Sequence, residues 1–154
     1  MVSVGKRVEN FTIPATGDQN LSLNDFSGHS LIIYFYPKDN TPGCTREGQD
    51  FSDLHAKFKA AGADILGVSR DSVRTHGNFR AKHKFPFHLL SDSEELLCKQ
   101  FDVIKEKKLY GRTYMGIERS TLLIGPTGVL QQEWRKVRVP GHAQEVLDAL
   151  LAQS

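Results

Sequence analysis

The chain has 154 residues, of which 39% are hydrophobic and 25% are charged, and its formal net charge at pH 7 is +2. This length suits one domain with a core of its own, so we expect residues 1–154 to form a single domain. The small net charge and the interspersed acids give no support to a nucleic-acid partner. No apolar run approaches the ~18 residues of a membrane span, so no membrane partner is expected.

The chain contains two cysteines, Cys44 and Cys98. Two are too few for the disulfide scaffold that stabilises many small secreted domains. The first residues lack the basic start and apolar core of a signal peptide, and we therefore expect a cytoplasmic protein. In a reducing cytoplasm, a lone accessible cysteine is more often chemically active than structural.

The N-terminal 28 residues predict an irregular segment with two short strands. One strand is expected around residues 11–13, and another around residues 21–23. Residues 24–28 are rich in turn formers. Together they predict a small hairpin at the edge of a sheet.

A β-α-β unit follows. Residues 30–36 form a nearly continuous apolar and β-branched run, which is typical of a central strand covered on both faces. A helix is expected from about residue 42 to residue 61, and residues 64–69 predict the next strand. The helix carries apolar residues at helical spacing: Phe51, Leu54, Phe58 and Ala61. A strand, a helix and a parallel strand form a right-handed unit.

The next segments predict a helix capped by Asp71 or Ser72, a strand over residues 85–90, and a short helix over residues 94–101 with a cap within residues 91–93. Residues 102–116 show no strong periodicity, and we expect a long loop there. Loops of this length are usually functional or mobile.

The C-terminal part predicts an antiparallel hairpin and a final helix. The hairpin comprises strands over residues 118–124 and 129–137, joined by a turn over residues 125–128. The helix runs from residue 142 to residue 152. The whole order predicts an α/β protein with a mixed central sheet flanked by helices, a thioredoxin-like fold with an N-terminal β-hairpin extension.

One stretch brings a cysteine to the start of a helix. The apolar strand runs into a proline-punctuated loop, Asn40 or Thr41 can cap the helix, and Pro42 suits its first position. Cys44 then lies in the first turn, among unpaired backbone N–H groups and at the positive end of the helix dipole, where a thiolate is favoured. The alternative is a buried structural cysteine beside a helix cap.

The residues Pro37-x-x-x-Thr41-x-x-Cys44 match the active-site pattern of peroxiredoxins. The fuller stretch over residues 34–47 resembles the bacterioferritin comigratory protein (BCP, or peroxiredoxin Q) subfamily, and further similarity covers most of the chain. This resemblance implies a thiol-dependent peroxidase, an oxidoreductase that reduces hydrogen peroxide and alkyl hydroperoxides through a cysteine sulfenic acid in antioxidant defence. It implies no metal, haem or flavin cofactor.

We expect Cys44 to be the nucleophile, with the Thr41 hydroxyl turned toward it and Pro37 shielding the thiolate from water. The BCP resemblance places the required cation at Arg119, and Glu47 could orient that guanidinium. Glu47 could equally be an acid that complements the helix dipole. Arg46 is a second candidate for the cation. Without the resemblance, Arg119 would be interpreted as an exposed arginine on a strand.

BCP proteins often carry a second, resolving cysteine, at positions that Gln49 and Arg80 occupy here. Cys98 is the only internal candidate, and its place beside two leucines favours a buried structural thiol. We therefore expect an external thiol reductant such as thioredoxin, glutaredoxin or a low-molecular-weight thiol, and a protein that is a monomer or a weak dimer.

Two alternatives to a peroxidase stay open. A thioredoxin-like disulfide exchange protein would need a Cys-x-x-Cys pair, which the sequence lacks. A binding module that kept the fold without catalysis is the other alternative. The six histidines lie apart, without a His-x-x-x-His pair, so no metal site is predicted.

Overall fold

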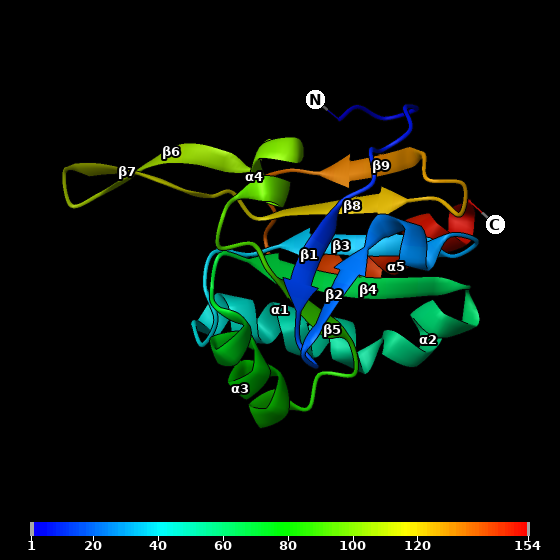
Figure 1. Cartoon of the computed structure of the whole chain (residues 1–154), viewed down its shortest axis with the longest axis horizontal. Helices are drawn as coiled ribbons and strands as arrows, with labels where there is room; N and C mark the ends of the chain where they lie inside the picture. Colours follow the sequence, from blue (N-terminus) through cyan, green and yellow to red (C-terminus); the bar gives the residue numbers. More distant parts are fainter. Residues whose placement is uncertain (1, 154) are drawn as a thin grey trace.

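The structure is a computed structural model that describes residues 2–153. Within these residues, seven strands form one sheet in the order β2-β1-β5-β4-β3-β8-β9 (Figure 1). The strands of this sheet are β1 (Thr12–Ala15), β2 (Gln19–Ser22), β3 (Ser30–Phe35), β4 (Ala63–Ser69), β5 (His88–Ser91), β8 (Ser120–Ile124) and β9 (Leu130–Trp134). The helices are α1 (Pro42–Asp53), α2 (His55–Ala60), α3 (Val73–His83), α4 (Leu96–Gln100) and α5 (His142–Ala152), with a 3-10 turn at Leu23–Phe26.

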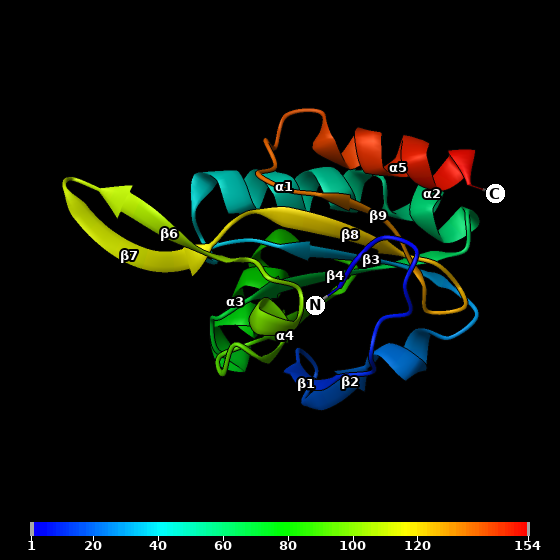
Figure 2. The ribbon, with the colours of Figure 1, turned by 90° about the horizontal axis from the view of Figure 1, so that it is seen from above.

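Strand β3 is the centre of the fold. It pairs in parallel with β4 and antiparallel with β8, and all six of its residues are buried. Because side chains alternate along a strand, Ile33 and Phe35 pack into one apolar cluster, whereas Ile32 and Tyr34 pack into another. Figure 2 shows α1 and α5 on one side of the central strands and α4 on the other, toward which the β1–β2 hairpin at the sheet edge bends. The predicted mixed sheet flanked by helices, a thioredoxin-like fold, is confirmed.

Several predicted elements are present. The N-terminal hairpin lies at the edge of the sheet, where β1 pairs with β2 and meets β5. Ser72 caps α3, since its hydroxyl accepts a hydrogen bond from the Thr75 N–H at 3.1 Å. The short helix expected over residues 94–101 is α4, but its N-cap residue is Glu95 and not one of residues 91–93. Asp92 nevertheless accepts hydrogen bonds from the N–H groups of Leu97 and Cys98 in the first turn. In the part of the chain that the structure describes, no helix combines the length and apolar character needed to cross a membrane.

Some predicted boundaries were wrong. The helix expected over residues 42–61 is divided at Leu54 into α1 and α2. The strand expected from residue 85 begins only at His88, and β9 ends at Trp134. Arg119 was placed on a strand, but it lies in the connection just before β8.

The largest correction concerns residues 102–116, which were predicted to form a loop. They contain most of an antiparallel hairpin made of β6 (Ile104–Leu109) and β7 (Arg112–Ile117), which projects from the body of the protein (Figures 1 and 2). Most of its side chains are exposed or half-buried, and residues 105–108 of β6 are all charged. The strands therefore lack the apolar alternation by which a half-buried strand is recognised.

Candidate active site

Cys44 lies in the first turn of α1, at the end of the sheet where β3 delivers the chain. Pro42 occupies the start of the helix, and Thr41 is the N-cap residue with extended backbone angles. The Thr41 side chain makes no capping hydrogen bond, so the backbone N–H groups of this turn are left to other acceptors. Cys44 is 2% exposed, and it is a free thiol. The predicted placement of Cys44 at a helix start is confirmed.

One guanidinium group connects Cys44 to Glu47. Arg119 Nη2 donates to the Cys44 sulfur at 3.3 Å, and Arg119 Nη1 donates to Glu47 Oε1 at 2.5 Å. The planar fork of arginine serves both acceptors at once, which a lysine ammonium cannot do with the same geometry. Arg46, the competing candidate, is exposed and pairs with Asp50 instead. The structure thus brings together Cys44, Arg119 and Glu47 from two distant segments.

Burial and charge oppose each other in this pair. Burial raises the pKa of Glu47 to about 7, although the charge and hydrogen bond of Arg119 act to lower it. Burial of the guanidinium works against its charge, but Glu47 and Cys44 outweigh this effect and raise the pKa of Arg119. Glu47 Oε2 is buried and has no hydrogen-bond partner among residues 2–153. Glu47 is therefore a carboxyl group that titrates near neutral pH.

Thr41 and Pro37 lie on the loop that leads into α1, and both are half-buried. The Thr41 hydroxyl donates its proton to the Lys38 carbonyl at 2.8 Å. Its oxygen lone pairs remain able to accept a further hydrogen bond. The hydroxyl is therefore free to accept a hydrogen bond, whereas its own proton is already donated to Lys38 and not to the Cys44 sulfur.

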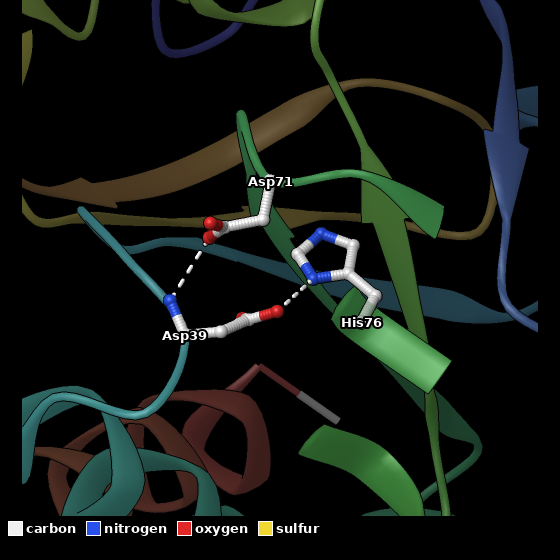
Figure 3. Close-up of side chains that lie close together, drawn as sticks. All are labelled: Asp39, Asp71 and His76. Atoms are coloured by element: carbon white, nitrogen blue, oxygen red, sulfur yellow. Dashed lines mark hydrogen bonds and ion pairs between the residues drawn. The ribbon is translucent and has the colours of Figure 1, made fainter. Parts of the chain in front are cut away.

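A buried network holds this loop in place (Figure 3). His76 Nε2 lies 2.8 Å from the Leu90 carbonyl oxygen, which can only accept, so Nε2 carries a proton. His76 Nδ1 lies 2.6 Å from Asp39 Oδ2, and Tyr36 donates to the other oxygen of Asp39 at 2.5 Å. The loop is thus bonded to α3 and β5 between Pro37 and Thr41, the two residues expected to shape the site.

Sequence reasoning missed this network. Potential ligand atoms of Asp39, Asp71 and His76 lie within 4.8 Å of one another, as in a metal site. However, Asp71 accepts from the Asp39 N–H and from Ser69, and the Asp39 and His76 side chains bond to each other. We therefore interpret the cluster as a structural network. Asp39 follows β3 and Asp71 follows β4, and the carboxyl ends of these two parallel strands lie at the same edge of the sheet. An acidic residue after each predicted strand was therefore the sequence signal that the two side chains lie close together.

Lys107 is a second cation near the site. It falls in residues 102–116, which were predicted to form a loop, but it is half-buried on β6. Burial lowers the pKa of Lys107, the positive charge of Arg119 lowers it further, and the charge of Cys44 acts in the opposite direction. Lys107 therefore lies within electrostatic reach of both Cys44 and Arg119.

Cys98 lies on the other side of the sheet. Cys44 belongs to the apolar cluster that contains Ile32 and Tyr34, whereas Cys98 belongs to the one that contains Ile33 and Phe35. Burial, with the neighbouring Asp92, raises the pKa of Cys98 well above its ordinary value. Such a thiol is inert, which fits the structural alternative given above.

Gln49 and Arg80 occupy the two positions at which BCP proteins often carry the resolving cysteine. Gln49 is exposed on α1, and its amide nitrogen lies 3.5 Å from His83 Nδ1. Arg80 Nε donates to the Phe87 carbonyl at 2.8 Å and so ties α3 to the segment before β5. Neither side chain can form a disulfide with Cys44.

Comparison with known proteins gives a consistent result. The AhpC/TSA family matches residues 4–133. Peroxiredoxin Bcp of Xanthomonas campestris is 56% identical over 146 residues, which cover 94% of this chain and 91% of that protein. Peroxiredoxin Bcp of Bacillus subtilis is 46% identical over 149 residues, which cover 97% of this chain and 95% of that protein.

Solved structures agree with these sequence matches. A mutant of Xylella fastidiosa PrxQ superposes with a TM-score of 0.95 at 48% identity, covering 99% of this chain and 98% of that one. Xanthomonas campestris bacterioferritin comigratory protein, solved in trapped intermediate and ligand complexes that give insight into its alkyl peroxide reduction activity, superposes with a TM-score of 0.89 at 55% identity. That match covers 93% of this chain and 91% of the other.

Proposed function

Because this chain belongs to the AhpC/TSA family and is a thiol-dependent peroxidase of the Bcp (peroxiredoxin Q) type, we propose that Cys44 is the residue that attacks the peroxide. The observation that supports this assignment is the contact between Arg119 and the Cys44 sulfur at a helix start. A guanidinium and free backbone N–H groups both favour the thiolate, which is the nucleophilic form of cysteine.

The reaction proceeds by displacement at oxygen. The Cys44 thiolate attacks the terminal oxygen of the hydroperoxide, a sulfur–oxygen bond forms, and the oxygen–oxygen bond breaks. The electron pair leaves with the distal oxygen, which takes up a proton to give water or an alcohol, and Cys44 becomes a sulfenic acid. Arg119 stabilises the thiolate and the charge that develops on the oxygens.

The remaining site residues position the reactants. The Thr41 oxygen, whose proton is committed to Lys38, accepts the O–H of the hydroperoxide and so orients it. Glu47 holds the Arg119 fork at the correct angle. Pro37, which lacks an N–H, shapes the loop between β3 and α1 and limits water access.

The substrates are hydrogen peroxide and alkyl hydroperoxides. The alkyl class is supported by the activity described for the Xanthomonas campestris relative. Cys44 and Cys98 lie on opposite faces of the sheet, so the sulfenic acid is resolved by an external thiol, with thioredoxin, glutaredoxin and low-molecular-weight thiols as candidates. The two free thiols fit a reducing compartment, and we place the reaction in the cytoplasm, in antioxidant defence.

The test is peroxide consumption by the purified protein with dithiothreitol as reductant. We expect turnover by the wild type and none by Cys44→Ser, whereas Cys98→Ala should retain turnover. Equal activity of the wild type and Cys44→Ser would show that another group carries the reaction. Reduction of a disulfide substrate without peroxide consumption would favour the thioredoxin-like alternative.

A further inference from the structure

The β6–β7 hairpin presents two different faces. In the antiparallel register, Lys107 lies opposite Tyr114, and Leu109 lies opposite Arg112. Residues opposite each other share a face, and alternate residues along each strand share it too. One face therefore carries Lys105, Lys107, Leu109, Arg112 and Tyr114, and we call it the cationic face. The opposite face carries Glu106, Lys108, Thr113 and Met115, and at its base it packs Ile117 into the cluster that contains Cys98.

The cationic face is opposite the one that packs Ile117 into the cluster with Cys98, whereas Cys44 belongs to the cluster on the other side of the sheet. A Cβ atom built on Gly116 would lie 3.1 Å from the Tyr114 ring and 3.2 Å from Lys107 Cδ, so both side chains lean back over Gly116 toward the base of the hairpin. The chain then passes from β7 directly to Arg119, which contacts the Cys44 sulfur. The charges of Cys44 and Arg119 act on Lys107, as described above. The base of this face is therefore the part of the hairpin connected to the site, and a molecule bound along the face could reach from the tip toward Arg119.

The composition of the hairpin is unusual for an exposed element without a partner. It carries four cations, Lys105, Lys107, Lys108 and Arg112, against one acid, Glu106. It also exposes large apolar or aromatic side chains, with Tyr114 46% and Leu109 55% exposed. Adjacent aromatic and cationic side chains at an exposed surface are typical of protein interfaces, where Tyr and Arg are enriched.

The turn at the tip adds an independent observation. Tyr110 has φ +51° and Gly111 has φ +75°, so both residues adopt the left-handed region. Asn-Gly or Asp-Gly would suit such a two-residue turn, and a bulky residue there is conformationally costly. Tyr110 is 96% exposed, so packing within the chain does not account for its ring. A costly backbone conformation at an exposed aromatic residue is typical of a functional position, and Tyr110 is therefore available for contact with another molecule.

We propose that the cationic face of the β6–β7 hairpin, with Tyr110 at its tip, docks a protein dithiol reductant whose reactive thiol is surrounded by acidic and apolar side chains. This inference rests on the proposed function, because a Cys44 sulfenic acid without an internal partner must be attacked directly by the thiol of an external reductant. The cations of the hairpin favour a partner with acidic side chains, because opposite charges attract across an interface. The exposed Leu109 and Tyr114 side chains favour contact with a protein surface rather than with a small thiol.

The docked reductant completes the cycle in two steps. Its first thiolate attacks the Cys44 sulfur, the sulfur–oxygen bond breaks, and the hydroxide leaves as water after taking up a proton. The resulting mixed disulfide is attacked by the second thiol of the reductant, which releases the Cys44 thiolate. The reductant ends as an internal disulfide, so it supplies both electrons.

The experiment compares two reductants on the same full-length variants. Peroxide reduction is measured with a purified thioredoxin, recycled by its reductase and NADPH, and separately with dithiothreitol, which is too small to need the hairpin. The test variants are Tyr110→Asn, which suits the turn, Tyr114→Thr and Arg112→Glu. Met115→Thr and Lys108→Glu are matched controls, because they make equivalent changes on the opposite face.

We expect each test variant to raise the KM for thioredoxin about tenfold, with kcat and the dithiothreitol rate unchanged. The controls should behave as wild type, and added salt should raise the KM of the wild type more than that of Arg112→Glu.

The proposal is overturned if the test variants and the control variants behave alike. It is also overturned if the test variants lose activity with both reductants together, because the face would then be needed for peroxide binding or for folding. It is also overturned if dithiothreitol supports turnover and thioredoxin does not. Sedimentation showing a wild-type dimer that Tyr114→Thr dissociates would assign the face to a second copy of the chain. Absence of turnover with either reductant would instead refute the proposed function itself.

Discussion

Arg119 is the residue through which Cys44 and Glu47 are connected. Its two terminal nitrogens donate to the Cys44 sulfur and to Glu47, and the carboxyl group is almost completely buried. The contact with Glu47 thus orients the guanidinium toward the Cys44 sulfur, which is the geometry that the proposed stabilisation of the thiolate requires. Two predictions at the scale of single residues follow from this geometry.

The first prediction concerns Arg119→Lys. A lysine ammonium retains the charge but cannot serve both acceptors in one plane, so we expect the rate constant for sulfenic acid formation to fall about tenfold to a hundredfold. Single-turnover reaction of the reduced protein with hydrogen peroxide measures this rate. Arg46→Lys is the matched control and should react at the wild-type rate. An unchanged rate in Arg119→Lys would remove Arg119 from the proposed mechanism.

The second prediction concerns pH and Glu47. Because burial raises the pKa of Glu47 to about 7, the folded protein binds a proton that the unfolded chain releases near pH 4.5. The free energy of unfolding contributed by Glu47 is therefore highest below pH 4.5 and falls as pH rises toward 7. Relative to Glu47→Gln, which does not titrate, we expect the wild type to lose up to about 3 kcal/mol across this window. Urea denaturation at several pH values measures the difference, and a pH-independent difference contradicts the assignment.

At the scale of elements, the loop between β3 and α1 is held by α3 through the Asp39–His76 contact. Neither side chain of this pair is more than slightly exposed to solvent. The loop carries Pro37 and Thr41, so the position of these proposed site residues depends on α3, a helix to which we assign no catalytic residue.

The third prediction is that His76→Leu destabilises the protein by about 3–5 kcal/mol, because it leaves one oxygen of the buried Asp39 carboxylate without its imidazole partner, with only the Tyr36 hydroxyl still bonded to the other. The same variant should slow peroxide reduction, since the loop is no longer bonded to α3 and β5. Adding Asp39→Asn should recover part of the lost stability, and chemical denaturation of both single variants and the double variant measures the coupling. Additive effects of the two substitutions would argue against a direct pair.

At the scale of the whole molecule, the sheet separates the two thiols. Side chains on the two faces of β3 enter different clusters, and each cluster contains one cysteine. A disulfide requires two Cα atoms within about 7 Å, and no local shift of a side chain can bring that about across a sheet.

The fourth prediction is that one equivalent of peroxide leaves Cys44 as a sulfenic acid that dimedone traps, without a Cys44–Cys98 disulfide. Excess peroxide should drive Cys44 to sulfinic acid. Mass spectrometry of the wild type and Cys98→Ala distinguishes these products, and turnover with dithiothreitol should be equal in both. A rapidly formed internal disulfide, with turnover lost in Cys98→Ala, would show that this one-cysteine route is wrong.

The sequence by itself determined the features that depend on short stretches of chain. The apolar run of β3, the proline-punctuated loop and the start of α1 were readable locally, and they placed Cys44 correctly. The order of strands and helices predicted the mixed sheet, because apolar periodicity reports which faces are buried. The family resemblance named Arg119, which local chemistry alone would have left as an exposed arginine.

Only the tertiary structure decided which distant groups meet. Arg119 and Glu47 are 72 residues apart, and Asp39 and His76 are 37 residues apart. No local pattern specifies these pairs, because each depends on strand order, register and helix packing. The projecting hairpin was missed because strands exposed on both faces have no apolar alternation. Cys44 is separated from Cys98 because α1 and α4 cover opposite sides of the sheet. Which side a helix covers depends on contacts with strands that are distant in the sequence, so it is decided only in the folded chain.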